Sequence, residues 1–117
     1  MYFWTKYDQM TIEKKHPSFG EHLRSLREET GQTLKTVADN FGMDASLLAK
    51  IERNERQPTK QIINQVAVYF QVDKKELKSE FLSDQIAYKI LEEEADLSIL
   101  KVAEEKVKYL KTVNNAK

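Results

Sequence analysis

The chain has 117 residues, 40% of them hydrophobic and 32% charged, with only three glycines and two prolines; this suits one compact domain, with or without an appended element, built of long uninterrupted helices. Its 19 Lys and Arg residues balance 19 Asp and Glu residues, so a nucleic-acid surface has to be a local basic cluster and not a property of the whole chain. The absence of cysteine excludes disulfides, thiol catalysis and cysteine-bound zinc.

Residues 1–17 make up the first segment, an aromatic-rich arm that precedes the folded domain. Its aromatic side chains are those of Tyr2, Phe3, Trp4 and Tyr7. Two explanations stay open: the arm docks on the rest of the chain as a short extended segment, or Met10 is the natural start and the residues before it are an addition. Pro17 disfavours the helical conformation at the residue before it, so we expect the first helix to begin after this proline.

The first helix is predicted from the capping box that Ser18 and Glu21 form, with Ser18 as the N-cap. Apolar residues follow at helical spacing: Phe19, Leu23 and Leu26. Gly31 stands where this helix should end, because glycine readily adopts the left-handed conformation of a helix terminus.

A helix, a tight turn and a second helix are predicted at about residues 33–53. Thr33 is placed to cap the first of these helices and Asp44 to cap the second, since both side chains can accept hydrogen bonds from free backbone N–H groups. Gly42 supplies the left-handed position that the reversal needs, and Asn54, which tolerates that conformation, can end the second helix. The apolar side chains expected to face the core are those of Val37, Ala38, Phe41, Leu48 and Ile51. This pattern is typical of a helix-turn-helix.

Two further helices complete the domain. One is expected at about residues 60–70, and the other is a short helix opened by a capping box of Asp73 and Glu76. Their apolar residues fall at helical spacing: Ile63, Val66, Ala67 and Phe70 in the first, Leu77 and Phe81 in the second. The sequence therefore predicts an all-α protein whose five-helix domain spans residues 18–82.

Residues 83–117 are predicted to form a C-terminal helical tail, with an apolar stripe in residues 84–113, which contain neither glycine nor proline. The stripe approximates the heptad spacing of a coiled-coil seam, with one shift near Leu100. The tail is either one long helix or two helices with a break near Asp96. The stripe either packs on the protein's own core or forms a dimer seam; we favour the seam, because one helix of this length extends beyond so small a domain. The expected seam residues are Leu97, Leu100, Val107 and Leu110.

The second helix of the helix-turn-helix presents an outward face that suits the major groove of DNA. Its side chains are those of Ala45, Ser46, Ala49 and Lys50. Small side chains let a helix backbone sit deep in a groove about 12 Å wide, while Lys50 can reach O6 or N7 of guanine. A local basic stripe begins at Lys50 and continues through Arg53, Arg56 and Lys60. Phosphate contacts need a stripe of this kind. Acidic residues at positions 52 and 55 interrupt this stripe, so taken alone it also fits an ordinary charged surface.

One run of residues follows the turn glycine in the pattern Ile-Glu-Arg-x-x-Arg-x-Pro: Ile51-Glu52-Arg53, Arg56 and Pro58. Earlier residues belong to the same set: Phe19, Leu23, Leu26-Arg27, Gly31, Val37-Ala38, Gly42, Asp44 and Ser46. With these residues, the segment 18–82 resembles the Cro/cI-type, lambda-repressor-like family of helix-turn-helix transcription regulators, also called the xenobiotic-response-element family. The resemblance covers a little over half of the chain.

The resemblance implies roles for individual residues. The positions that match base readers are Ala45, Ser46 and Lys50. The positions that match phosphate contacts are Thr33, Lys35, Arg53, Arg56 and Lys60. Arg27 and Glu52 match a partly buried ion pair that ties the first helix to the third. Two departures stand out: Leu34 replaces the family's usual glutamine, which removes one phosphate contact, and Asn54 replaces the usual glycine.

From this resemblance we expect a sequence-specific regulator that binds double-stranded DNA as a homodimer on an inverted repeat and controls its own operon. Residues 81–88 more loosely resemble short regulators encoded beside DNA methyltransferases, which adds a restriction-modification operon as an option. The alternative is a protein-interaction module, such as an antitoxin or adaptor, whose tail or aromatic arm holds another protein. An enzyme is not expected, since the sequence shows no paired acid and base, nucleophile constellation or phosphate loop.

No cofactor, metal or membrane partner is expected either. His16 and His22 lack the i, i+4 spacing of a helical metal pair, and no acidic residue joins them in a recognisable motif. No apolar run reaches about 18 residues, the length of a membrane span, and residues 1–6 are too short and too aromatic for a signal peptide. We therefore expect a cytoplasmic protein.

Overall fold

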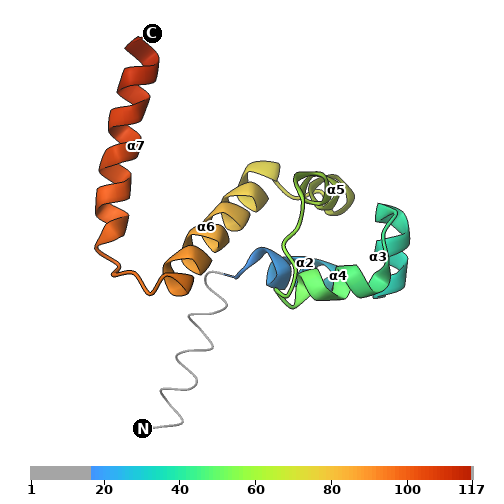
Figure 1. Cartoon of the computed structure of the whole chain (residues 1–117). Helices are drawn as coiled ribbons and strands as arrows, with labels where there is room; N and C mark the ends of the chain where they lie inside the picture. Colours follow the sequence, from blue (N-terminus) through green and yellow to red (C-terminus); the bar gives the residue numbers. More distant parts are fainter. Residues whose placement is uncertain (1–16, 117) are drawn as a thin grey trace, which may run out of the picture. The chain divides into compact units, whose positions relative to one another are not determined.

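The computed structural model describes residues 17–116, so the aromatic arm predicted at residues 1–17 lies outside the described residues except for Pro17. Within the described range every regular element is a helix and there is no strand, as Figure 1 shows. The predicted all-α fold with a C-terminal helix is therefore confirmed. The helices are α2 (Phe19–Glu29), α3 (Leu34–Phe41), α4 (Ala45–Glu52), α5 (Lys60–Phe70), α6 (Lys74–Glu92) and α7 (Ile99–Ala116).

The chain divides into two compact units, the first ending at Asp84 and the second beginning at Gln85. The first unit holds α2 to α5 and the first part of α6, and the second holds the rest of α6 and α7. None of the described helices has both the length and the apolar character that a membrane span requires.

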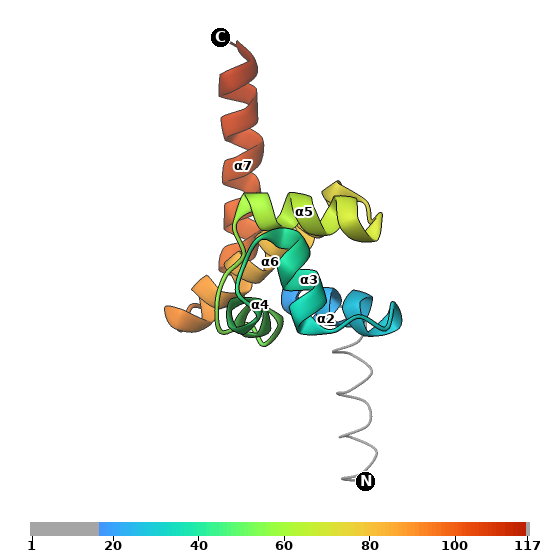
Figure 2. The same cartoon turned by 90° about the vertical axis from the view of Figure 1, so that its right-hand side faces the viewer.

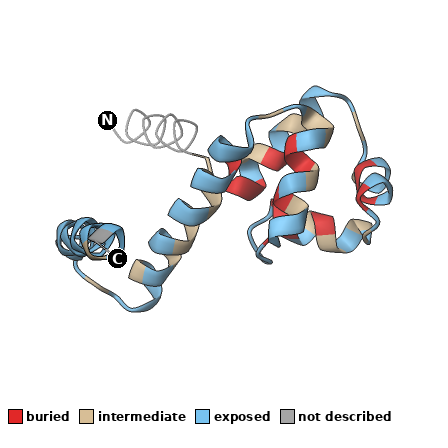
Figure 3. Cartoon of the chain, turned by 90° about the horizontal axis from the view of Figure 1, so that it is seen from above, coloured by how far each residue is buried: buried red, intermediate tan, exposed pale blue. Residues whose placement is uncertain are grey.

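The core of the first unit is built from the apolar faces that helical spacing predicts. Its buried side chains come from every helix between α2 and α6, as the colouring of Figure 3 shows. They are Phe19, Leu23, Val37, Ala38, Phe41, Leu48, Ile51, Ile63, Val66, Ala67 and Leu77. Leu26, Phe70 and Phe81 are partly buried against this core. Five helices thus share one core, which holds α3 and α4 in place.

The ends of α2 and α3 form at the predicted capping and turn residues. Ser18 Oγ accepts a hydrogen bond from the backbone N–H of Glu21 (3.2 Å), and the Glu21 carboxylate accepts one from the N–H of Ser18 (2.9 Å), which completes the capping box. Gly31 and Gly42, just beyond the two helices, adopt left-handed conformations with φ of 67° and 68°. These residues set the lengths of α2 and α3.

The largest departure from the sequence prediction is the length of α6. The prediction of a short helix after Asp73 is wrong, because α6 runs from Lys74 to Glu92. No glycine or proline occurs in the residues beyond Phe81, many of which are strong helix formers, so nothing stops the helix at the predicted boundary between residues 82 and 83. The helix ends near Glu94, which has a left-handed φ of 52°. The tail therefore has the two-helix form, with its break near Asp96.

α2 approaches the end of α4 closely at two residues whose importance is hard to see in the sequence. A Cβ atom on Gly20 would lie 2.3 Å from the backbone oxygen of Ile51 and 2.7 Å from Asn54 Oδ1, so a larger residue there would force the helices apart. Asn54 has a left-handed φ of 63°, and its Oδ1 accepts a hydrogen bond from Ser18 Oγ (3.0 Å). The asparagine at this position thus adds a contact between α2 and the chain that follows α4.

Two carboxylates of α6 hold the first turn of α2. Asp84 Oδ2 accepts a hydrogen bond from the backbone N–H of Phe19 (2.9 Å), and the Glu80 carboxylate lies 2.8 Å from His22 Nδ1. Partial burial raises the pKa of both carboxyls, although the hydrogen bonds that they accept act in the opposite direction. Their partners therefore offset only part of the cost of burying these two charges.

We expect the stability of Asp84→Asn, relative to wild type, to increase as the pH rises above 3.8, the ordinary pKa of this carboxyl. A carboxyl whose pKa is raised by folding stabilises the protein below its unfolded pKa and loses that contribution as the pH rises through its folded pKa. The asparagine oxygen can still accept the N–H of Phe19 but carries no charge. Urea unfolding at several pH values measures the difference, with Glu105→Gln, an exposed change on α7, as control. Parallel profiles for Asp84→Asn and wild type would contradict this account.

Candidate nucleic-acid interface

α3 and α4 are joined by a short turn at residues 42–44 and meet at an angle, as Figure 2 shows. The left-handed conformation of Gly42 allows the reversal, and the N–H of Met43 then bonds the carbonyl of Ala38 at 3.0 Å. At the other end of α3, Thr33 Oγ1 accepts the N–H of Thr36 (3.1 Å), as its predicted capping role requires. Because α4 contacts both α3 and α2, the core holds one of its sides and leaves the other open.

The open side of α4 carries the residues predicted to read bases. Leu48 and Ile51 are buried and anchor the helix in the core. Ser46 and Lys50 are exposed, and Ala45 is partly exposed. Ser46 and Lys50 thus lie on the exposed side of α4, whereas Ala45, at the start of the helix, is partly buried against the core. Their contact with bases stays a prediction.

Asp44 does not cap α4 as we predicted. It occupies the N-cap position, with φ −72° and ψ 141°, but its carboxylate accepts no hydrogen bond from the helix. The N–H groups of Leu47 and Leu48 both bond the main-chain carbonyl of Asp44 instead, each at 3.1 Å. The N–H of Leu47, which a capping carboxylate of Asp44 would bind, is therefore already bonded to the main chain. The exposed carboxylate still suits the positive end of the helix dipole and disfavours a phosphate at the same place.

The cations predicted to contact bases or phosphates fall into two groups. Lys35 Nζ lies 3.1 Å from Asp39 and Arg53 Nε lies 2.8 Å from Glu55, so each has an acidic partner from its own segment. Other cations have no acidic partner within salt-bridge distance among residues 17–116: Lys50, Arg56 and Lys60. The positive charge that is free to meet a phosphate is therefore concentrated on this second group.

Glu55 is the residue of the interface that sequence analysis undervalued. In the sequence it only interrupts the basic stripe, but in the structure both of its carboxylate oxygens accept hydrogen bonds from Arg53, at 2.8 and 3.3 Å. The hydrogen bond from Arg53 is the main reason that the pKa of Glu55 is lowered, and the charge of Lys50 lowers it further. The signal for this pairing in the sequence is that Glu55 follows Arg53 by two residues in the loop after α4.

The structure brings Arg27 and Glu52, the residues of the predicted ion pair, into direct contact. Arg27 Nε and Nη2 donate to the two Glu52 oxygens at 2.7 and 3.0 Å, and Nη1 donates to the carbonyl of Gln32 at 3.0 Å. The side chains are only 13% and 4% exposed. The hydrogen bond to Glu52 raises the pKa of Arg27 above its ordinary value. The pair links α2 to the end of α4, so it positions the interface and leaves ligand contact to other residues.

A family model described as a helix-turn-helix domain matches residues 18–79, which is more than half of the chain. The chain belongs to this helix-turn-helix domain family. In such motifs the second helix is the one that lies in the major groove of DNA, and in this helix-turn-helix domain that helix is α4. The membership supports a DNA-binding regulator in general. Comparison with curated proteins gives no match.

The residues of the predicted seam lie in the second unit. Leu100, Val107 and Leu110 are on α7, and each is about half exposed. Leu97 comes before the start of α7 and is 70% exposed, so it is not part of the helical stripe. Among the described side chains of α7 none is buried, as Figure 3 shows. The choice between a dimer seam and packing on the protein's own core stays a prediction.

Proposed function

We propose that this protein is a sequence-specific transcription regulator of the lambda-repressor-like kind, with α4 as its recognition helix. The observation that carries the proposal is an α4 face of small side chains, accompanied by cations without acidic partners in the described part of the chain: Lys50, Arg56 and Lys60. Phosphate contacts supply affinity and position, while contacts to base edges supply specificity. The neighbouring cations are suited to the phosphate contacts, and the α4 face is suited to the base contacts.

In the proposed complex the N-terminal half of α4 enters the major groove. Ser46 and Lys50 face the base edges, with Lys50 reaching a guanine and the Ala45 methyl group meeting a thymine methyl group. Arg56 and Lys60 bind phosphates beside the groove. Thr33 already uses its hydroxyl to cap α3, so any phosphate at this position is held by main-chain N–H groups at the start of the helix.

We propose that the active form is a homodimer joined through α7. Leu100, Val107 and Leu110 are seven and three residues apart, as in the heptad spacing of a coiled-coil seam, and are exposed in the second unit. A two-fold dimer presents two copies of α4, and the matching operator is an inverted repeat. Control of the protein's own operon, or of a restriction-modification operon, is the use that we propose for it; no enzymatic activity is proposed.

The exposed stripe on α7 also favours a second candidate, an antitoxin or adaptor that keeps the helix-turn-helix domain and binds another protein through its tail. The two candidates differ in what α7 contacts. A regulator of the first kind is a dimer in isolation, whereas an adaptor that needs its partner to cover the stripe is a monomer in isolation. Sedimentation of the purified full chain separates them.

Selection of bound sequences from a random duplex pool tests the regulator proposal. We expect an inverted repeat whose half-sites are about one helical turn apart, roughly 34 Å or 10 bp. Lys50→Ala should lower the affinity by about 1–3 kcal/mol and relax the preference at one position in each half-site. A selected consensus without symmetry, or one that Lys50→Ala leaves unchanged, would exclude this docking of α4.

Arg56→Ala should weaken binding to all duplex sequences to a similar extent, because Arg56 is assigned to a phosphate. The slope of log affinity against log salt concentration should flatten by about one unit. Arg53→Ala should change the slope less, since Arg53 is already paired with Glu55. Lys75→Ala, an exposed change on α6, serves as control. Fluorescence anisotropy at several salt concentrations gives the slopes, and equal slopes for Arg56→Ala and wild type would disprove the phosphate contact.

A further inference from the structure

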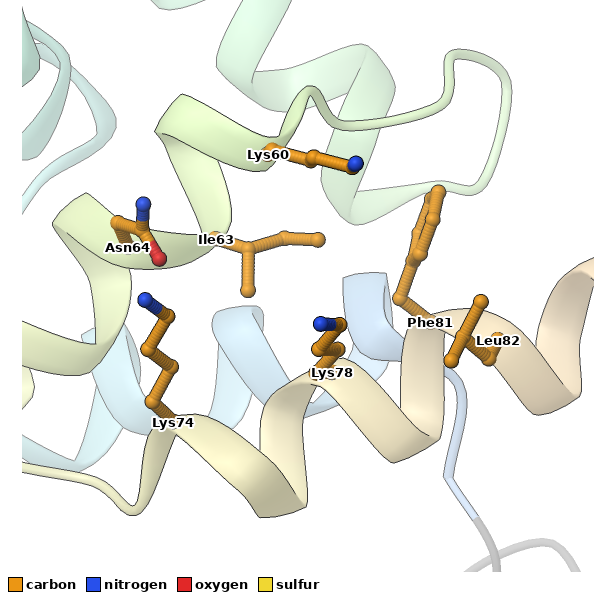
Figure 4. Close-up of a pocket in the computed structure, with 7 residues that line it drawn as sticks. All are labelled: Lys60, Ile63, Asn64, Lys74, Lys78, Phe81 and Leu82. Atoms are coloured by element: carbon orange, nitrogen blue, oxygen red, sulfur yellow. The ribbon is translucent and has the colours of Figure 1, made fainter. Parts of the chain in front are cut away.

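A pocket of about 140 Å³ lies between α5 and α6 in the first unit, as Figure 4 shows. Its apolar wall is formed by Ile63, Phe81 and Leu82. Ile63 is 4% exposed and Leu82 is 49% exposed, so the pocket extends from the edge of the core to the surface. An engineered apolar cavity of about 150 Å³ holds benzene. The pocket therefore has room for a ring or short chain of about six carbons.

Three lysines surround this apolar wall, Lys60 from the start of α5 and Lys74 and Lys78 from α6. Within residues 17–116 none of them has an acidic group at salt-bridge distance. Like charges around a shared cavity repel one another, and an anion at its rim relieves that repulsion. The amide of Asn64, which also lines the pocket, adds a neutral hydrogen-bond donor. The pocket thus joins an apolar interior to a cationic rim.

We propose that this pocket binds a small organic carboxylate whose apolar body has about six carbons. The apolar body lies against Ile63, Phe81 and Leu82, and the carboxylate meets the ammonium groups at the rim. An inorganic anion leaves the apolar wall in contact with water, and a neutral ring leaves the lysines without a counter-charge. For a ligand this small, we expect a Kd on the order of 1 mM.

The site also connects to DNA binding, in a step that rests on the proposed function. Lys60 lines the pocket and is one of the cations assigned to a phosphate. A carboxylate paired with Lys60 removes one cation from the duplex contact, so bound carboxylate and bound DNA weaken each other. Losing one phosphate contact should lower the DNA affinity about fivefold near physiological salt.

Titration of the full chain with benzoate, followed by amide NMR, tests the pocket without DNA. Benzoate should cause saturable shifts at Ile63, Phe81 and Leu82, whereas acetate, which lacks the ring, and benzyl alcohol, which lacks the charge, should not. Lys74→Gln combined with Lys78→Gln should weaken benzoate binding about five- to tenfold. Lys75→Gln changes a neighbouring lysine that does not line the pocket and should bind benzoate as wild type does.

Each result bears on a different step. Absence of saturable shifts with benzoate, equal shifts with benzyl alcohol, or equal losses from Lys75→Gln and the double variant would overturn the pocket assignment. The DNA step is measured separately, by titrating the selected operator with and without saturating benzoate at matched ionic strength. An unchanged DNA affinity would overturn the coupling through Lys60. Failure of the protein to bind any duplex would overturn the proposed function while leaving the NMR result to decide the pocket.

Discussion

Replacing Arg27 by alanine should destabilise the folded protein by about 3 kcal/mol, because it leaves the Glu52 carboxylate buried without a counter-charge. Glu52 is 4% exposed in its side chain, and both of its oxygens accept hydrogen bonds from Arg27. The same change removes the hydrogen bond to the carbonyl of Gln32. Thermal and urea unfolding of the full chain measure the loss.

The chain offers a matched control on the same helix. Arg24 pairs with Glu28 at 3.2 Å, but these side chains are 58% and 55% exposed, so Arg24→Ala should cost less than about 1 kcal/mol. Replacing Arg27 and Glu52 together by Met and Leu should recover most of the lost stability, since no buried charge then remains. If Arg27→Ala unfolds at the same urea concentration as Arg24→Ala, the pair does not hold α2 against α4.

Placing glutamate at both Leu100 and Val107 should abolish the proposed dimer and weaken operator binding by at least about 100-fold. Charges along a closely packed helical seam are not tolerated, and a monomer loses the gain in effective concentration that links the two half-sites. Sedimentation gives the oligomeric state, and anisotropy with the selected operator gives the affinity. These changes leave α7 helical, because glutamate is a good helix former.

Val102→Glu with Tyr109→Glu is the control for this experiment. Both residues are also exposed on α7, at 50% and 67%, but helical spacing places them about 120° or more from the stripe of Leu100 and Val107. They should leave the dimer and the operator affinity unchanged. A dimer that survives the seam changes, or one that is lost equally in the control, would move the interface away from the predicted seam.

Local signals in the sequence were sufficient for most of the first unit. Capping residues, turn glycines and apolar spacing predict α2 to α5 closely, because each signal acts within a few residues of its own helix. These signals do not predict the length of α6. Phe81 packs against the core, but no glycine or proline ends the helix after it. The local signals also fail for Asp44, whose capping role depends on which backbone donors remain free.

Interactions between distant segments were harder to predict. The ion pair of Arg27 and Glu52 followed from a family resemblance and not from spacing. The need for glycine at position 20 depends on how closely α2 approaches the end of α4, which no local pattern records. The pocket between α5 and α6 was also not predicted from the sequence. In the sequence, the lysines that line it are indistinguishable from those of an ordinary solvent-exposed helix face.

The pairing of Lys35 with Asp39 and of Arg53 with Glu55 has a kinetic consequence for the proposed regulator. The interface has three cations without acidic partners in the described part of the chain, Lys50, Arg56 and Lys60. They imply that about three counterions per subunit are released on contact with random duplex, so each visit to a wrong site is brief. Such a protein searches by frequent dissociation and rebinding more than by long sliding runs. Its distribution over the chromosome should therefore readjust quickly when its concentration changes, and Glu55→Gln, which frees Arg53, should slow that exchange by lengthening each non-specific dwell.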